Sequence, residues 1–280
     1  DMLVNVVNMV VSYVLAVFTP MGALGVALGT VIAQFTGLTL ALILLISKYR
    51  HVFRGLSLWH LARDMQGMRS LVTLNANLFV RSLCFMIVYV GFTSLSSMYG
   101  DTDLAVCSIL MKLFMLVSYF VDGFAYAGEA LVGKYIGEAK SLASSPYRLS
   151  PLASIVRLLF LWSLGVGAIF TVLFAVSYLP MYRMMTSDTV VLARLTDFTG
   201  WLIAMPIVST LAFMWDGVFT GATAGKQIRN AMIWAAVGFV LGYVASYHHL
   251  GTHALFVGYF LHLAARVIYL TAAWKQVVEQ

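Results

Sequence analysis

The chain alternates between long apolar stretches and shorter polar ones, a pattern typical of helices that cross a membrane. About 20 consecutive apolar residues span the hydrocarbon core of a bilayer. Eight stretches reach or approach that length: 2–18, 24–46, 72–98, 104–133, 156–179, 199–221, 231–247 and 254–274. Short turns and longer polar loops alternate between these stretches. The sequence therefore predicts an all-α polytopic membrane protein of about eight transmembrane helices, arranged as helical hairpins.

Composition strengthens this prediction. Hydrophobic residues make up 61% of the 280 residues and charged residues only 10%, whereas soluble domains carry about 25% charged residues. Cys84 and Cys107 lie inside apolar stretches and form neither a disulfide framework nor a metal-ligand spacing. The sequence contains no phosphate-binding GxxxxGK(S/T) motif and no spacing that indicates a nucleophile and its base. We therefore expect a protein that is not an enzyme and holds no cofactor.

The net charge of +6 is distributed unevenly between the two ends of the predicted helices. One set of connections (47–71, 134–157, 222–230 and the C-terminal tail) holds twelve Lys and Arg residues, and the opposite set holds only Arg183 and Arg194. Basic connections stay on the cytoplasmic side of a membrane. This bias predicts a plasma (inner) membrane protein with a cytoplasmic C-terminus, and it favours the lipid bilayer over nucleic acid as the partner of the basic residues.

The longest basic connection, 47–71, mixes apolar residues with arginines. Leu56, Trp59 and Met65 among Arg54 and Arg63 indicate a helix that lies at the membrane interface. An ordinary solvated loop is the alternative interpretation. In either case this connection is the best candidate for a boundary between two helical subdomains.

Five ionisable residues lie well inside apolar stretches. One of them, Lys112, lies near the outer third of its helix, and the other four lie on four different predicted helices: Arg81, Asp122, Asp216 and Arg266. Counting residues to the nearest cytoplasmic Lys or Arg places all four roughly 13–18 Å from the cytoplasmic charges. One hypothesis is an ion-paired cluster that fixes the packing of the bundle. The other is that Asp122 or Asp216 binds and releases a cation, because a carboxylate titrates whereas arginine stays charged.

Further polar residues are candidates for a substrate cavity. Spacings of i, i+4 and i+7 place Asp122, Tyr126 and Glu129 on one face of their helix. Asn5 shares a face with Asn8 and Ser12 in the first stretch. Such residues in spanning helices either bond neighbouring helices together or face a substrate or ion.

One short sequence pattern occurs twice. Asp122-Gly123 and Asp216-Gly217 lie at similar depth in helices that run in the same direction, and each glycine opens a small-xxx-small spacing. This spacing lets two helix backbones approach closely in lipid. The histidines of the outer turn, His248, His249 and His253, match no standard metal site, so we expect no metal.

Four stretches occur in order along the chain: GALGVALGTVIAQ (22–34), ILMKLFMLVSYFVDGFAYAGEALVGKYIG (109–137), WDGVFTGATAGKQIRNAM (215–232) and LAARVIYL (263–270). They resemble segments of the multidrug and toxic compound extrusion (MATE) transporters, especially their DinF-like branch. The second stretch is similar to the eighth transmembrane helix of that family, and the third to its tenth helix and following turn. Together the matches cover almost the whole chain.

The resemblance implies two six-helix lobes around a central cavity, with this chain aligned to helices five to twelve. Residues 1–46 would then be the last two helices of a truncated N-terminal lobe, 47–71 the cytoplasmic connection between lobes, and 72–280 the C-terminal lobe. The start at Asp1, without Met and inside an apolar stretch, predicts the same, namely a fragment that lacks the first four helices. We expect a monomer.

The resemblance also implies a function, a secondary active efflux transporter that exchanges amphipathic or cationic small molecules for Na⁺ or H⁺ by alternating access. Of the carboxylates that the family uses for coupling, only the acid of helix ten has a counterpart here, Asp216; the acid of helix five is replaced by Met9. The alternatives are a lipid-linked saccharide flippase of the same superfamily, a membrane scaffold without transport, and, least favoured, an intramembrane enzyme built around the outer histidines.

Overall fold

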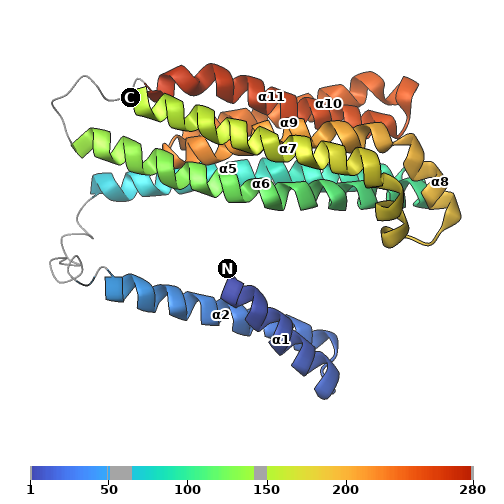
Figure 1. Cartoon of the computed structure of the whole chain (residues 1–280), viewed down its shortest axis with the longest axis horizontal. Helices are drawn as coiled ribbons and strands as arrows, with labels where there is room; N and C mark the ends of the chain where they lie inside the picture. The colour runs from blue at the N-terminus through green and yellow to red at the C-terminus, as the bar shows by residue number, and fades with distance from the viewer. Residues whose placement is uncertain (1, 49, 51–64, 142–149, 279–280) are drawn as a thin grey trace. The chain divides into compact units, whose positions relative to one another are not determined.

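Every regular element of the described residues is an α-helix. The computed structural model describes residues 2–48, 50, 65–141 and 150–278. The helices are α1 (Met2–Phe18), α2 (Ala23–Lys48), α5 (Met65–Ser97), α6 (Asp101–Ser141), α7 (Ser150–Met185), α8 (Thr189–Asp197), α9 (Thr199–Gly221), α10 (Gly225–Leu250) and α11 (His253–Val278) (Figure 1). The prediction of an all-α membrane protein is confirmed.

Seven helices of the described ranges are long and apolar enough to cross a membrane: α2, α5, α6, α7, α9, α10 and α11. The first predicted span, α1, has 17 residues and a length of roughly 26 Å, short of the ~30 Å hydrocarbon core. The short helix α8 was not predicted, because its nine residues lie in a connection between two predicted spans and are too few to cross a bilayer. The predicted interfacial helix in 47–71 falls largely on 51–64, outside the described residues.

The chain divides into two compact units, Asp1–Met68 and Arg69–Gln280. The predicted boundaries of the N-terminal pair of helices, the connection and the C-terminal lobe stay predictions about a longer protein. Within the second unit many large apolar side chains are exposed, for example Trp162 (61%) and Val176 (80%) on α7. Exposed apolar surface of this extent suits contact with lipid.

The first unit is a hairpin of α1 and α2 that packs through glycines. A Cβ atom at Gly25 would lie 2.8 Å from the backbone of Leu15, and one at Gly29 would overlap Ser12. The single hydroxyl hydrogen of Ser12 is shared between Oδ1 of Asn8 (2.9 Å) and the carbonyl of Val26 on α2 (3.3 Å). This part of the polar face predicted for the first stretch therefore joins the two helices.

In the second unit, α6 packs along α9, α7 along α9, and α10 along α11 (Figure 1). Small residues permit the closest of these contacts. A Cβ atom at Gly217 would overlap the carbonyl oxygen of Ala125 on α6, and one at Gly221 would overlap that of Glu129. By contrast, a Cβ atom at Gly123 would meet nothing within 4 Å. Of the two Asp-Gly pairs, only the second lies at a close helix contact.

The ends of α6, α8 and α11 near the turn at Gly251 are joined by a polar network. Asp188 begins α8 by accepting a hydrogen bond from the backbone of Val190 (2.8 Å), a standard N-cap. Arg194 then donates to Asp103 of α6 at 2.9 Å, and Thr252, beside α11, donates to the same carboxylate. The hydrogen bond to Asp103 raises the pKa of Arg194.

The contact between α6 and α9 yields a prediction about stability. Gly217→Ala places a methyl group against the carbonyl of Ala125 and forces the two helices apart. Such overpacking costs about 1–3 kcal/mol, so the thermal unfolding midpoint in detergent should fall. Gly123→Ala is the matched control on the neighbouring helix and should leave the midpoint unchanged or raise it slightly, since alanine favours helix. Equal midpoints for the two variants would contradict the packing described.

Candidate functional site

The second unit contains a cavity of about 310 Å³ between α5, α6, α9, α10 and α11. All four charged residues singled out from the sequence border it, together with Tyr126 and Glu129. The complete lining is Arg81, Ser82, Phe85, Asp122, Ala125, Tyr126, Glu129, Phe213, Asp216, Gly217, Thr220, Met232 and Arg266. Asn5, the other predicted cavity residue, is exposed on α1 in the first unit, and its role stays a prediction.

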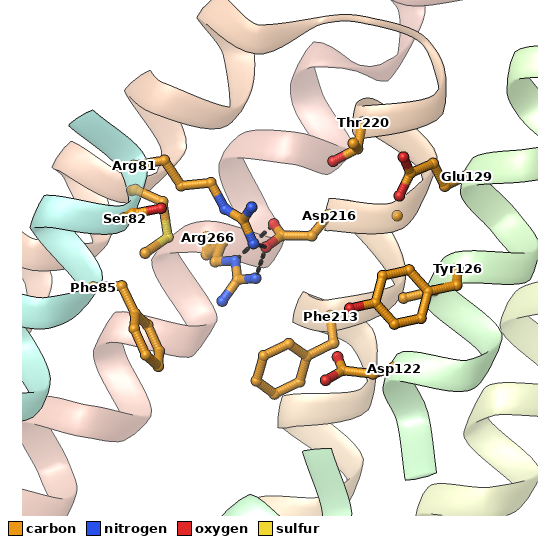
Figure 2. A pocket seen from close by; sticks show the side chains of 13 residues that line it. Arg81, Ser82, Phe85, Asp122, Tyr126, Glu129, Phe213, Asp216, Thr220 and Arg266 are labelled. Carbon is orange, nitrogen blue, oxygen red and sulfur yellow. Dashed lines mark hydrogen bonds and ion pairs between the residues drawn. The ribbon is translucent and has the colours of Figure 1, made fainter. Parts of the chain in front are cut away.

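One wall of the cavity is an ion-pair network centred on Asp216 of α9. Nη2 of Arg81, on α5, donates to Oδ2 of Asp216 at 2.8 Å. Nε of Arg266, on α11, donates to Oδ1 at 2.9 Å, and its Nη2 donates to Oδ2. Figure 2 shows both guanidinium groups converging on the one carboxylate. The network therefore connects three helices that are far apart in the sequence.

Burial differs between the two arginines of this network. Arg266 is 2% exposed and Asp216 5%, and the guanidinium of Arg266 lies 5.1 Å from the ring centroid of Phe213, in cation–π contact. The side chain of Arg81 is 33% exposed. A bidentate arginine–carboxylate pair is the geometry in which a buried charge pair is best satisfied. Arg266 and Asp216 form the core of the network, and Arg81 closes it from the cavity side.

Asp122 lies outside this network. No hydrogen bond or ion pair joins it to another of the described residues, and its side chain is half-buried. With Tyr126 and Glu129 it occupies one face of α6, as the spacing predicts, and Figure 2 shows this face across the cavity from Arg81. The structure thus brings three of the four predicted charges together and leaves the fourth on the opposite wall.

The charges of the cavity do not balance. The network of Asp216 with two arginines carries a formal charge of +1, and Asp122 with Glu129 carries −2. The lining as a whole therefore has a formal charge of −1. Because neither α6 carboxylate forms an ion pair with any described residue, the surplus negative charge lies on the wall formed by α6.

Two phenylalanines of the lining were not predicted from the sequence, although the third ring, that of Tyr126, was. Phe213 lies three residues before Asp216, and Phe85 lies four residues after Arg81. Residues three or four apart share a helix face, so extending the charged positions by one turn would have found both rings. Arg229, one of the basic residues of the connection 222–230, donates from Nη1 to Oδ1 of buried Asn77 at 2.9 Å, a contact that its position in the sequence did not indicate.

A family profile described as MatE matches residues 78–248 of the chain, which is more than half of its length. The chain belongs to the MatE family. The predicted resemblance, including the DinF-like branch, is confirmed: the chain is 31% identical to DNA damage-inducible protein F of Escherichia coli (strain K12) over 273 residues, 97% of this chain and 57% of that protein. It is 24% identical to Protein DETOXIFICATION 44, chloroplastic, of Arabidopsis thaliana over 97% of this chain and 49% of the relative.

Solved structures with the same fold belong to transporters. Vibrio cholerae MATE transporter VcmN in the bent form matches with a TM-score of 0.78 at 16% identity, covering 99% of this chain and 61% of that one. A MOP superfamily transporter from Pyrococcus furiosus matches with a TM-score of 0.79 at 14% identity over 99% and 62%. This MatE chain therefore spans about half to three-fifths of the length of these relatives. It is a multi-pass membrane protein of a family of transporters, not of enzymes.

The network around Asp216 yields a second stability prediction. Asp216→Asn leaves two guanidinium groups without a counter-charge, one of them buried, and removing one partner of a buried ion pair costs about 3–5 kcal/mol. The thermal unfolding midpoint in detergent should fall strongly. Asp122→Asn, which breaks no ion pair, should change the free energy of unfolding by less than ~1 kcal/mol. The account fails if the two variants are equally stable.

Proposed function

We propose that the whole protein to which this chain belongs is a secondary active efflux transporter. It exports amphipathic or cationic small molecules by alternating access, in exchange for Na⁺ or H⁺. The proposal rests on two unpaired carboxylates, those of Asp122 and Glu129, which face a cavity beside the ring of Tyr126. Membership of the MatE family supports it.

The two acids of the repeated Asp-Gly pattern take different roles in this proposal. Both oxygens of Asp216 accept hydrogen bonds from arginine, which cannot lose its proton. Asp216 therefore acts as a fixed clamp between helices, although the sequence alone favoured it as the coupling acid. Asp122 has no such partner and is the acid that we assign to the cation, whether coupling ion or substrate.

The lining of the cavity suits an organic cation. Its volume of about 310 Å³ lies at the lower end of the range for small-molecule sites. The rings of Phe85, Tyr126 and Phe213 offer π faces, which attract cations at close range. A cation in this cavity would be attracted by the carboxylates of α6 and repelled by the positively charged network on the opposite wall.

The proposal includes an orientation and an assembly state. The protein lies in the plasma membrane. Its basic connections and its C-terminus face the cytoplasm. The transporter works as a monomer. Both points rest on the distribution of Lys and Arg and on the cavity lying within one chain.

Antiport requires an ion gradient, which gives a direct test on the whole protein in proteoliposomes. Collapsing both the H⁺ and the Na⁺ gradient with ionophores should abolish efflux of a fluorescent lipophilic cation. Collapsing one at a time identifies the coupling ion. Efflux that continues unchanged without any gradient would refute the antiport mechanism.

Substitution of the α6 acids tests the site. Asp122→Asn should weaken binding of a fluorescent lipophilic cation to the whole protein by roughly ten- to a hundredfold, since a charge-assisted contact contributes about 1.5–3 kcal/mol. Glu129→Gln should weaken it less or equally. The control is Asp101→Asn, which removes an exposed carboxylate from the same helix, outside the cavity. An unchanged affinity in Asp122→Asn would exclude this residue from the site.

A further inference from the structure

A buried histidine next to the ion-pair network has no role in the function described so far. His262, on α11, is 1% exposed. Neither Nδ1 nor Nε2 of its ring has a hydrogen-bond partner among the described residues. Buried polar atoms are almost always hydrogen-bonded, so an exception calls for a physical explanation.

The surroundings of His262 connect it to the network. Arg266 follows one turn later on the same face of α11, and the ring of Tyr259 stacks on the imidazole with centroids 5.8 Å apart. The charged and titratable groups of the described residues that face His262 are Tyr259 and Arg266 on α11 and Asp216 on α9. From α10 the backbone of Ala235 faces the ring without a hydrogen bond of normal geometry.

The formal charge of the network determines the state of the ring in this structure. Arg81, Arg266 and Asp216 together carry +1. A protonated His262 would add a second uncompensated positive charge in a buried site, and among the described residues no acceptor lies in normal hydrogen-bond geometry to its N–H groups. Such a charge is costly, so the imidazole is neutral while both arginines bind Asp216.

Arg81 is the member of the network that can leave. It is held to Asp216 through Nη2 at 2.8 Å, with its side chain 33% exposed to the cavity, whereas Arg266 is buried and bound through two nitrogens. The backbone of α5 approaches no other described helix as closely as that of α11 approaches α10 and α9, and α5 is held through side chains such as Phe92, which packs against Phe256. Movement of α5 would therefore break the Arg81 contact first.

We propose that His262 is a buried proton-binding site that takes up a proton when Arg81 leaves Asp216. Without Arg81, the pair of Arg266 and Asp216 is neutral, and protonation of His262 restores the original charge of +1. A hydronium ion from water in the cavity, which Arg266 borders, supplies the proton. It forms the N–H bond at Nδ1 or Nε2, leaving water, and the proton returns to water when Arg81 binds again.

The site would give this lobe a group that titrates in step with a helix movement, in contrast to the permanently charged arginines. Histidine is suited to this role because its proton affinity lies near neutrality and responds to nearby charges. Protonation of His262 can be measured without a transported substrate or an ion gradient. Protonation of His262 could therefore be confirmed even if antiport were refuted, and antiport could be confirmed even if His262 did not bind a proton.

The test is a titration of ¹⁵N-labelled histidine by NMR on the full chain in detergent micelles or nanodiscs. The His262 resonance is identified by its loss in H262Q. In R81Q the proton affinity of His262 should rise about tenfold, a shift of ~1 pH unit, because Asp216 then has one cationic partner instead of two. R229Q is the control, since it removes an arginine of α10 that contacts Asn77 and Asn230 outside the network.

Two outcomes decide the proposal. A His262 titration that moves in R81Q but not in R229Q supports it. A titration that coincides in wild type, R81Q and R229Q overturns it and indicates that the two ring nitrogens are satisfied by buried water alone. Where R81Q does not fold, R81M serves with the same readout, since it keeps the length of the side chain and removes only the charge and the hydrogen bond.

Discussion

The arrangement of the second unit depends on one carboxylate held between two arginines. A charge in the middle of a membrane protein is costly unless it is paired, and Asp216 is paired on both oxygens, by Arg81 of α5 and Arg266 of α11. This interaction fixes the relative position of three helices at one depth. It also leaves a positive surplus that the rest of the cavity must accommodate, and the carboxylates of α6 supply the opposite charge.

Backbone packing and electrostatics are linked through Gly217 and Gly221. These residues follow Asp216 on α9 and let α6 approach until its carbonyl groups at Ala125 and Glu129 nearly touch α9. The same approach brings Asp122 and Glu129 to the edge of the cavity. An ion-paired network and a wall with two unpaired carboxylates therefore lie on opposite sides of one small volume.

Much of this could be predicted from the sequence, and the limits have physical causes. Hydrophobic length and the basic connections fix which residues share a depth, so Arg81, Asp216 and Arg266 could be grouped before any coordinates were known. Rotation of each helix about its axis is set by packing, which is why the sequence could not decide that Asp216 rather than Asp122 receives both arginines. The two Asp-Gly pairs illustrate this, because they have the same local sequence but differ in whether another helix lies against the glycine. The burial of His262 without hydrogen-bond partners likewise depends on where α9 and α10 lie, and a local sequence pattern does not determine those positions.

The central claim is that Arg81 and Asp216 act as one unit across α5 and α9. A double-mutant cycle tests it most directly, with the free energy of unfolding measured for wild type, Arg81→Gln, Asp216→Asn and the double variant. Because the double variant loses both members of the contact, its destabilisation should be smaller than the sum of the single effects by about 1 kcal/mol or more. Effects that simply add would mean that the two residues do not interact, and would contradict this account.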